Sequence, residues 1–274
     1  MLRRFSKDLK KYGRYLAFAS NADLKSEVAG SYLNWLWWIL DPLFMMLIYM
    51  FIMVALFKKN IDFAPIFVFV GLTMWDMFNK TVMRCARIVK EYSSLLKRVR
   101  MPKFLLVLQT MWIYGFKMLI SLGLVAVMMV VWAIFPIDPA GRLVVGWEAL
   151  WIVPVLVLFF LMVFALSMIV MNCGVYVEDL RNVLQVVLRL LFYMCGVFYD
   201  VTTLGFYAGY PWLETVLTKL NPISFLMISA RQCLLYQTIY EPVWMLVWTV
   251  LTLALCALGI HLVYKNENTY IKVI

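Results

Sequence analysis

The chain is poor in the residues that most active sites require. It has one histidine among 274 residues, and Asp, Glu, Lys and Arg together make up only 15%. A single histidine excludes metal sites built from several histidines, and it excludes acyltransferase centres of the His-x4-Asp type. The carboxylates are scattered, and Asp76 and Lys80, four residues apart on a helix, are expected to neutralise each other. We therefore expect no catalytic residue and no metal site.

Paired cysteines and a nucleotide-binding loop are also absent. The five cysteines have no CxxC spacing, which argues against a zinc site or a disulfide framework. The sequence contains no GxxxxGK[ST] motif, so the chain itself is not expected to bind ATP through a P-loop. A cleavable signal peptide is not expected either, because the first apolar run begins only at Trp35 and is long. We expect no cofactor on this chain.

Apolar residues dominate what is present. They make up 65% of the chain, whereas apolar residues make up about 45–50% of a soluble domain. The mean hydropathy of the chain is +0.88. A helix needs about 20 apolar residues to cross a bilayer. The sequence predicts an all-α membrane protein with one domain over residues 1–274. Six transmembrane helices are expected at 35–57, 64–83, 104–135, 149–171, 183–199 and 243–264.

Two of these segments depart from a simple span. Residues 104–135 are too long for one crossing, so the embedded part is expected at about 116–135, with Lys117 reaching back to the cytosolic side. Residues 183–199 are short and carry Arg189. The following region, 200–242, is apolar but repeatedly broken by Gly and Pro. It predicts two short re-entrant helices between the fifth and sixth spans, at about 211–219 and 223–236. The alternative is an ordinary loop on the outer surface.

Positive charge is distributed unevenly along the chain. The formal net charge is +10, and most of the 25 lysines and arginines lie in segments 1–34, 80–103, 172–182 and 265–274. Six spans place these segments on one side, and Lys and Arg accumulate on the cytosolic side of membrane proteins. Both termini are therefore expected in the cytosol. Because the charge is explained by topology, no nucleic acid is expected as a partner.

The N-terminal segment predicts an amphipathic helix. Over residues 2–19, Leu2, Phe5, Leu9, Tyr12 and Leu16 recur at spacings of three and four. Such a helix suits the headgroup plane of a membrane with anionic lipids, and the alternative is a helix packed on a partner protein. The residues on its basic side are Arg3, Arg4, Lys7, Lys10, Lys11 and Arg14.

The stretch "VKEYSSLLKRVRMPKF" (89–104) combines charge with an apolar stripe. Its apolar residues have helical spacing, and a proline stops the helix before the next span. It predicts a cytosolic helix over 89–102 that docks into a groove on another protein. The alternative is that its charges only fix topology. The residues assigned to docking are Glu91, Tyr92, Leu95, Leu96, Lys97, Arg98, Arg100 and Pro102.

Four stretches together resemble the permease subunits of ABC-2 type transporters. The closest resemblance is to the polysaccharide and polyol-phosphate permeases that export O-antigen, teichoic acid or capsule. In this resemblance, the stretch at 89–104 corresponds to the coupling helix of the family. The stretches are "DLKSEVAGSYLNWLWWILDPLF" (23–44), "VKEYSSLLKRVRMPKF" (89–104), "YVEDLRNVLQVVLRLLFYMCGVFY" (176–199) and "LNPISFLMISARQCLL" (220–235).

The resemblance implies a homodimer with two copies of a separate ABC ATPase subunit that binds ATP and Mg. It also implies export of a lipid-linked glycan across the bacterial plasma membrane, through a pore lined by the first and fifth spans. Two rival interpretations are an ABC-2 exporter of lipids or hydrophobic drugs, and a non-transporting scaffold or enzyme of lipid-linked glycan assembly. Aromatic candidates for the pore, with lipid contact or core packing as the alternative, are Tyr49, Phe192, Tyr193, Phe198 and Tyr199.

Overall fold

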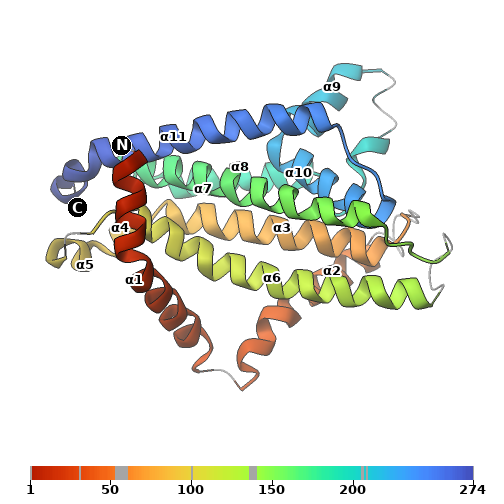
Figure 1. Cartoon of the computed structure of the whole chain (residues 1–274), viewed down its shortest axis with the longest axis horizontal. Helices are drawn as coiled ribbons and strands as arrows, with labels where there is room; N and C mark the ends of the chain where they lie inside the picture. The colour runs from red at the N-terminus through yellow and green to blue at the C-terminus, as the bar shows by residue number, and fades with distance from the viewer. Residues whose placement is uncertain are drawn as a thin grey trace.

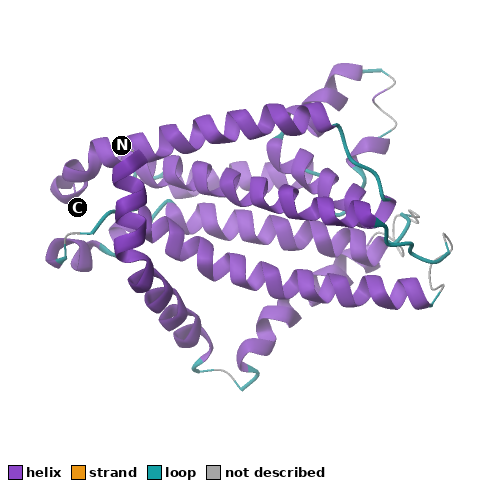
Figure 2. Cartoon of the chain, in the orientation of Figure 1, coloured by secondary structure: helices purple, strands orange, loops and turns teal. Residues whose placement is uncertain are grey.

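The computed structural model describes residues 2–30, 32–52, 61–99, 101–135, 141–204, 207 and 209–273. Every regular element in these ranges is a helix, which confirms the all-α prediction (Figure 2). The α-helices are α1 (Leu2–Val28), α2 (Trp37–Phe51), α3 (Ala64–Cys85), α4 (Ile88–Glu91), α5 (Ser93–Arg98), α6 (Phe104–Ile134), α7 (Ile152–Tyr176), α8 (Leu180–Met194), α9 (Pro211–Thr215), α10 (Pro222–Arg231) and α11 (Pro242–Val273). Shorter helical turns cover Asn34–Leu36, Trp147–Trp151, Val201–Thr203, Val216–Leu220 and Gln232–Tyr236.

The long helices α3, α6, α7 and α11 run side by side along the longest axis of the molecule (Figure 1). Helix α3 forms the centre of the bundle and packs against α2, α6, α7, α8 and α10, so most of its apolar side chains are buried. Helix α1 crosses one end of the bundle, and both chain termini and α4–α5 lie at that end. We call this the terminal end, and the opposite end, where α3 and α7 begin, the far end.

Three helical segments are long and apolar enough to cross a membrane: Phe104–Ile134, Trp147–Tyr176 and Pro242–Glu267. These coincide with the third, fourth and sixth predicted spans. Helices α2 and α8 have 15 residues each, or about 23 Å at 1.5 Å per residue, which is short of a 30 Å hydrocarbon core. Residues 53–57 of the first predicted span lie outside the described residues. Helix α3 has 22 residues but carries Asp76, Lys80 and Arg84, so six spans remain a prediction.

Prolines and one asparagine explain where several helices begin. Proline stands in the first turn of α3, α9, α10 and α11, where its fixed φ fits the helix and its missing N–H costs nothing. The Asn221 side chain accepts hydrogen bonds from the backbone N–H groups of Ile223 and Ser224 and so caps α10. The two short helices predicted at 211–219 and 223–236 are present as α9 and α10 with their following turns. Their entry into the membrane stays a prediction.

A buried arginine holds α10 against the rest of the bundle. The Arg231 guanidinium is 2% exposed and donates to the backbone carbonyls of Phe67 (3.1 Å), Gly196 (2.7 Å) and Val197 (2.5 Å). It also lies 3.6 Å from the ring centroid of Phe67. A Cβ at Gly71 would collide with this guanidinium, so the glycine makes room for it. Arg231 thereby joins α10 to α3 and to the turn after α8.

Candidate functional site

The predicted docking helix at 89–102 is present as two short helices rather than one. Helix α4 ends at Glu91, Tyr92 breaks the helical path with φ −94° and ψ 17°, and α5 continues from Ser93 to Arg98. Val99 is extended, and Pro102 is buried immediately before α6. The segment lies at the terminal end beside the end of α11 (Figure 1).

A glycine in α7 sets the position of this segment. A Cβ at Gly174 would collide with the backbone carbonyl of Ala86, in the turn that joins α3 to α4. Only glycine therefore permits this turn to rest directly on α7. Ile88 and Val89 of α4 are 1% and 2% exposed, so the first helix of the segment is anchored in the bundle.

The apolar stripe of the segment requires a correction. Leu96 is 4% exposed and belongs to the chain's own hydrophobic core, while Tyr92 and Leu95 are half-buried against that core. Leu96 therefore cannot contact a partner in this conformation, because periodicity reveals an apolar face but not what covers it. The face directed outward carries Glu91, Ser94, Lys97, Arg98 and Val99. Arg100 lies outside the described residues.

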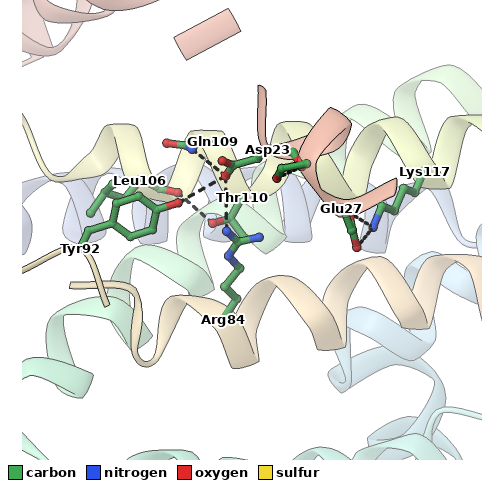
Figure 3. Close-up of polar contacts among 9 residues, drawn as sticks. Asp23, Glu27, Arg84, Tyr92, Leu106, Gln109, Thr110 and Lys117 are labelled. Carbon is green, nitrogen blue, oxygen red and sulfur yellow. Dashed lines mark hydrogen bonds and ion pairs between the residues drawn. The ribbon is translucent and has the colours of Figure 1, made fainter. Parts of the chain in front are cut away.

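A carboxylate in α1 connects this segment to three helices (Figure 3). The Oδ2 atom of Asp23 accepts a hydrogen bond from Gln109 of α6 at 2.9 Å and from the hydroxyl of Tyr92 at 3.3 Å. The Arg84 guanidinium of α3 lies 3.5 Å from the same oxygen. Burial raises the pKa of the Tyr92 phenol, which therefore stays protonated and able to donate. We call Asp23, Arg84, Tyr92 and Gln109 the Asp23 network.

One turn further along α1, a second ion pair ties the same helix to α6. Lys117 Nζ lies 2.6 and 2.7 Å from the two carboxylate oxygens of Glu27, as Figure 3 shows. The side chain of Lys117 is 15% exposed, and its partner Glu27 belongs to segment 1–34, which is expected in the cytosol; that Lys117 reaches the cytosolic side stays a prediction. Since Asp23 and Glu27 both bind α6, a shift of α1 along α6 would have to break both contacts.

The N-terminal half of α1 has the two faces that its sequence predicts. Phe5, Leu9, Tyr12 and Leu16 are half-buried, and Phe5 lies 4.7 Å from Phe104 between ring centroids. The six predicted basic residues, Arg3, Arg4, Lys7, Lys10, Lys11 and Arg14, are all exposed.

Arg4 differs from the other basic residues because it also binds α11. Its guanidinium donates to Glu267 at 2.9 Å and lies 4.6 Å from the ring centroid of Tyr264. The hydroxyl of Tyr264 in turn donates to Asp8 at 2.8 Å. The start of α1 is therefore fixed to the end of α11, while its remaining basic side chains face outward. Contact of this face with membrane lipid stays a prediction.

The predicted pore aromatics gather into one cluster. The rings of Tyr49 and Phe198 stack with centroids 5.1 Å apart, and Phe192 lies within 6 Å of both. Tyr193 and Tyr199 each contact Phe198 at 6.0 and 5.3 Å. Tyr193 is 55% exposed and the other four are half-buried, so the cluster forms a partly open surface between α2 and α8. A role in a pore is not decided by this packing and stays a prediction.

Sequence reasoning missed Trp75, Asp23 and Gln109 as members of these groups. Trp75 of α3 extends the aromatic cluster, with its ring 5.5 Å from that of Phe192. Asp23 carried no distinctive signal, since it is one of three acidic residues in α1, with Asp8 and Glu27. Gln109 carried a weak signal, as a polar side chain in a long apolar run.

Comparison with known proteins places these features in a family. The model of the ABC-2 type transporter family matches residues 20–235, which include the Asp23 network, α4–α5 and α10. The O-antigen export system permease protein RfbA of Myxococcus xanthus is 28% identical over 238 residues, covering 86% of this chain and 84% of that protein. An O-antigen export system permease protein RfbA of Klebsiella pneumoniae is 22% identical over 247 residues, covering 89% of this chain and 90% of that protein.

Proposed function

The chain belongs to the ABC-2 type transporter family, and we propose that it is the permease subunit of an ATP-driven glycan exporter. The substrate is a lipid-linked polysaccharide or polyol-phosphate polymer, carried across the bacterial plasma membrane. The observation that carries this proposal is similarity to permeases named for O-antigen export over nearly the whole length of both chains. Three helices long and apolar enough to cross a membrane agree with this role.

A separate ABC ATPase supplies the energy in this proposal. The sequence has no P-loop of its own, so ATP and Mg are held by the partner subunit. The terminal end faces the cytosol and receives the ATPase on the polar face of α5, which includes Arg98. Support comes from the concentration of basic residues on α1 and α4–α5, because cytosolic segments collect Lys and Arg.

The Asp23 network passes movement of α4–α5 to the membrane helices. Tyr92 lies between α4 and α5, and its partner Asp23 also holds Arg84 of α3 and Gln109 of α6. A displacement of the docked segment is therefore shared among α1, α3 and α6. This corresponds to rigid-body coupling between two packed states.

Two copies of the chain enclose the pore, with α2 and α8 at the contact between them. Support comes from the apolar side chains that both helices leave exposed, such as Leu47 (49%) and Leu190 (60%). The aromatic cluster lies between the same two helices. Aromatic rings suit sugar polymers because apolar C–H faces of pyranoses stack on them while the hydroxyls stay hydrated.

Charge reversal at the docking face tests the proposal. We expect Arg98→Glu to lower glycan export at least fivefold while leaving membrane insertion intact, because Arg98 is exposed and its side chain has no ion pair or hydrogen bond within the described residues. Export is measured in cells, and association is measured by co-purification of the ATPase. The matched control is Arg142→Glu, an exposed arginine at the far end. Normal export by Arg98→Glu, or an equal loss with the control, contradicts docking at this face.

A further inference from the structure

A polar groove lies between α3 and α8, and none of its lining residues belongs to the Asp23 network. Its volume is about 340 Å³, and it is lined by Asn79 and Trp75 of α3 together with Arg181, Gln185 and Arg189 of α8. The three α8 residues are spaced four apart, so they form one stripe along the helix. Phe192, one further residue of the lining, also belongs to the aromatic cluster.

The groove is rich in hydrogen-bond donors and has no negative charge. None of its lining residues is acidic, and neither arginine has an ion-pair partner in the part of the chain that the structure describes. Lys80, one residue beyond Asn79, provides the contrast. Its ammonium lies 2.8 Å from Asp76 and 3.5 Å from Asp41. Two arginines without a carboxylate partner among the described residues therefore lie together in the groove, whereas the neighbouring lysine is neutralised.

Two guanidinium groups and two amides offer many N–H donors to one ligand. Arginine forks match the oxygens of a phosphate group, which are negatively charged at pH 7 and accept hydrogen bonds from both N–H groups of the fork. Arg189 lies on the exposed polar side of the amphipathic helix α8, in line with Arg181 and Gln185 and next to Leu188. We propose that this groove binds the phosphate group of a membrane lipid.

The surroundings of the groove favour a lipid phosphate over a free one. Met83 of α3 and Leu188 of α8 also line the groove and give it apolar walls, which suit the start of a lipid chain. Trp75 and Phe192 at the other side lead into the aromatic cluster, which suits a sugar. This inference rests on the proposed function, under which the ligand is the phosphate that joins the exported glycan to its lipid.

The spacing of the arginines gives the site a direction. Arg181 lies in the first turn of α8, and Arg189 lies about 12 Å further along the helix axis. Arg181 is the closer of the two to the terminal end, and Arg189 is the closer to Phe192 and the aromatic cluster. A phosphate entering from the terminal end meets Arg181 first and Arg189 second.

Binding to the full-length chain in lipid nanodiscs tests the inference without the ATPase. The probes are a polyprenyl pyrophosphate, the matching uncharged polyprenol, and inorganic phosphate. We expect the double variant Arg181→Gln/Arg189→Gln to bind the pyrophosphate at least tenfold more weakly and the polyprenol unchanged. The Arg181→Lys/Arg189→Lys variant keeps the charge but not the fork of N–H donors. Its affinity for the pyrophosphate should lie between that of the unmodified chain and that of the double glutamine variant. The control Arg142→Gln should bind like the unmodified chain.

Three outcomes overturn the inference. They are unchanged pyrophosphate affinity in the double glutamine variant, equal weakening for the polyprenol, and binding of inorganic phosphate as tight as that of the lipid. A variant that alters dimerisation but not binding would place the arginines in a subunit contact instead. Export by the unmodified chain is scored separately. If the unmodified chain binds the pyrophosphate but does not export the glycan, the proposed function is contradicted. If the unmodified chain exports the glycan but the variants bind the pyrophosphate normally, only the assignment of the phosphate site to this groove is contradicted.

Discussion

Replacing Asp23 with asparagine is expected to lower glycan export about tenfold while ATP hydrolysis by the assembled complex continues. The side chain keeps its size but loses the charge that Arg84, Tyr92 and Gln109 share. Hydrogen bonds to a charged group contribute about 1.5–3 kcal/mol each, and the coupling between two sites is commonly 1–3 kcal/mol. Loss of this charge, with one acceptor oxygen replaced by an NH2 group, should therefore weaken the coupling of α4–α5 to α3 and α6. The measurement is glycan exported per ATP hydrolysed.

A matched control separates coupling from the mere loss of a carboxylate. Asp62 is exposed and has no ion pair or side-chain hydrogen bond to any residue that the structure describes, so Asp62→Asn should leave the ratio unchanged. Tyr92→Phe removes only one donor of the Asp23 network and should reduce the ratio by a smaller factor. An unchanged ratio in Asp23→Asn, with normal amounts of protein in the membrane, would contradict a coupling role for the network.

Replacing Arg231 with methionine is expected to produce the largest loss of stability. The change leaves the carbonyls of Gly196 and Val197 without the donor that satisfies them in a buried site. Each unsatisfied buried group costs about 1–3 kcal/mol. The melting temperature of the purified chain in detergent should therefore fall on the order of 10 °C. Arg231→Lys should lose less, because one ammonium retains the charge but cannot reach all three carbonyls in the same geometry.

Two further variants check the reason for this loss. Gly71→Ala should destabilise in the same direction, because the added Cβ occupies the space of the Arg231 guanidinium. Arg142→Met removes an exposed arginine and should leave the melting temperature within about 1 °C. A melting temperature for Arg231→Met equal to that of the Arg142 variant would show that Arg231 does not hold α10 in place.

Local sequence signals were sufficient for most helices. Apolar runs located the helices around 104–135, 149–171 and 243–264, and proline with asparagine located the starts of α9 and α10. The spacing of Phe5, Leu9 and Tyr12 gave the buried face of α1 correctly. Each of these signals lies within one helix, so a single sequence contains it.

Features that depend on contacts between distant residues could not be predicted in the same way. The Asp23 network joins residues 23, 84, 92 and 109, and no local pattern relates these positions. Leu96 shows the same limit, because its helical spacing indicates an apolar face without indicating that α5 turns this face inward. The break at Tyr92 lies where the segment has no proline or glycine, so no local signal marks it.

The most direct test of the account is ATP-driven transport by the reconstituted complex. The chain is co-purified with its ABC ATPase, placed in proteoliposomes, and given a polyprenyl-linked glycan, the same glycan without lipid, or small hydrophobic amphiphiles. The account predicts that the lipid-linked glycan stimulates ATP hydrolysis and crosses the membrane, whereas the other two do neither. Stimulation by the amphiphiles without response to the lipid-linked glycan would contradict glycan export. Failure of the chain to co-purify with any P-loop ATPase would contradict its role as a permease subunit.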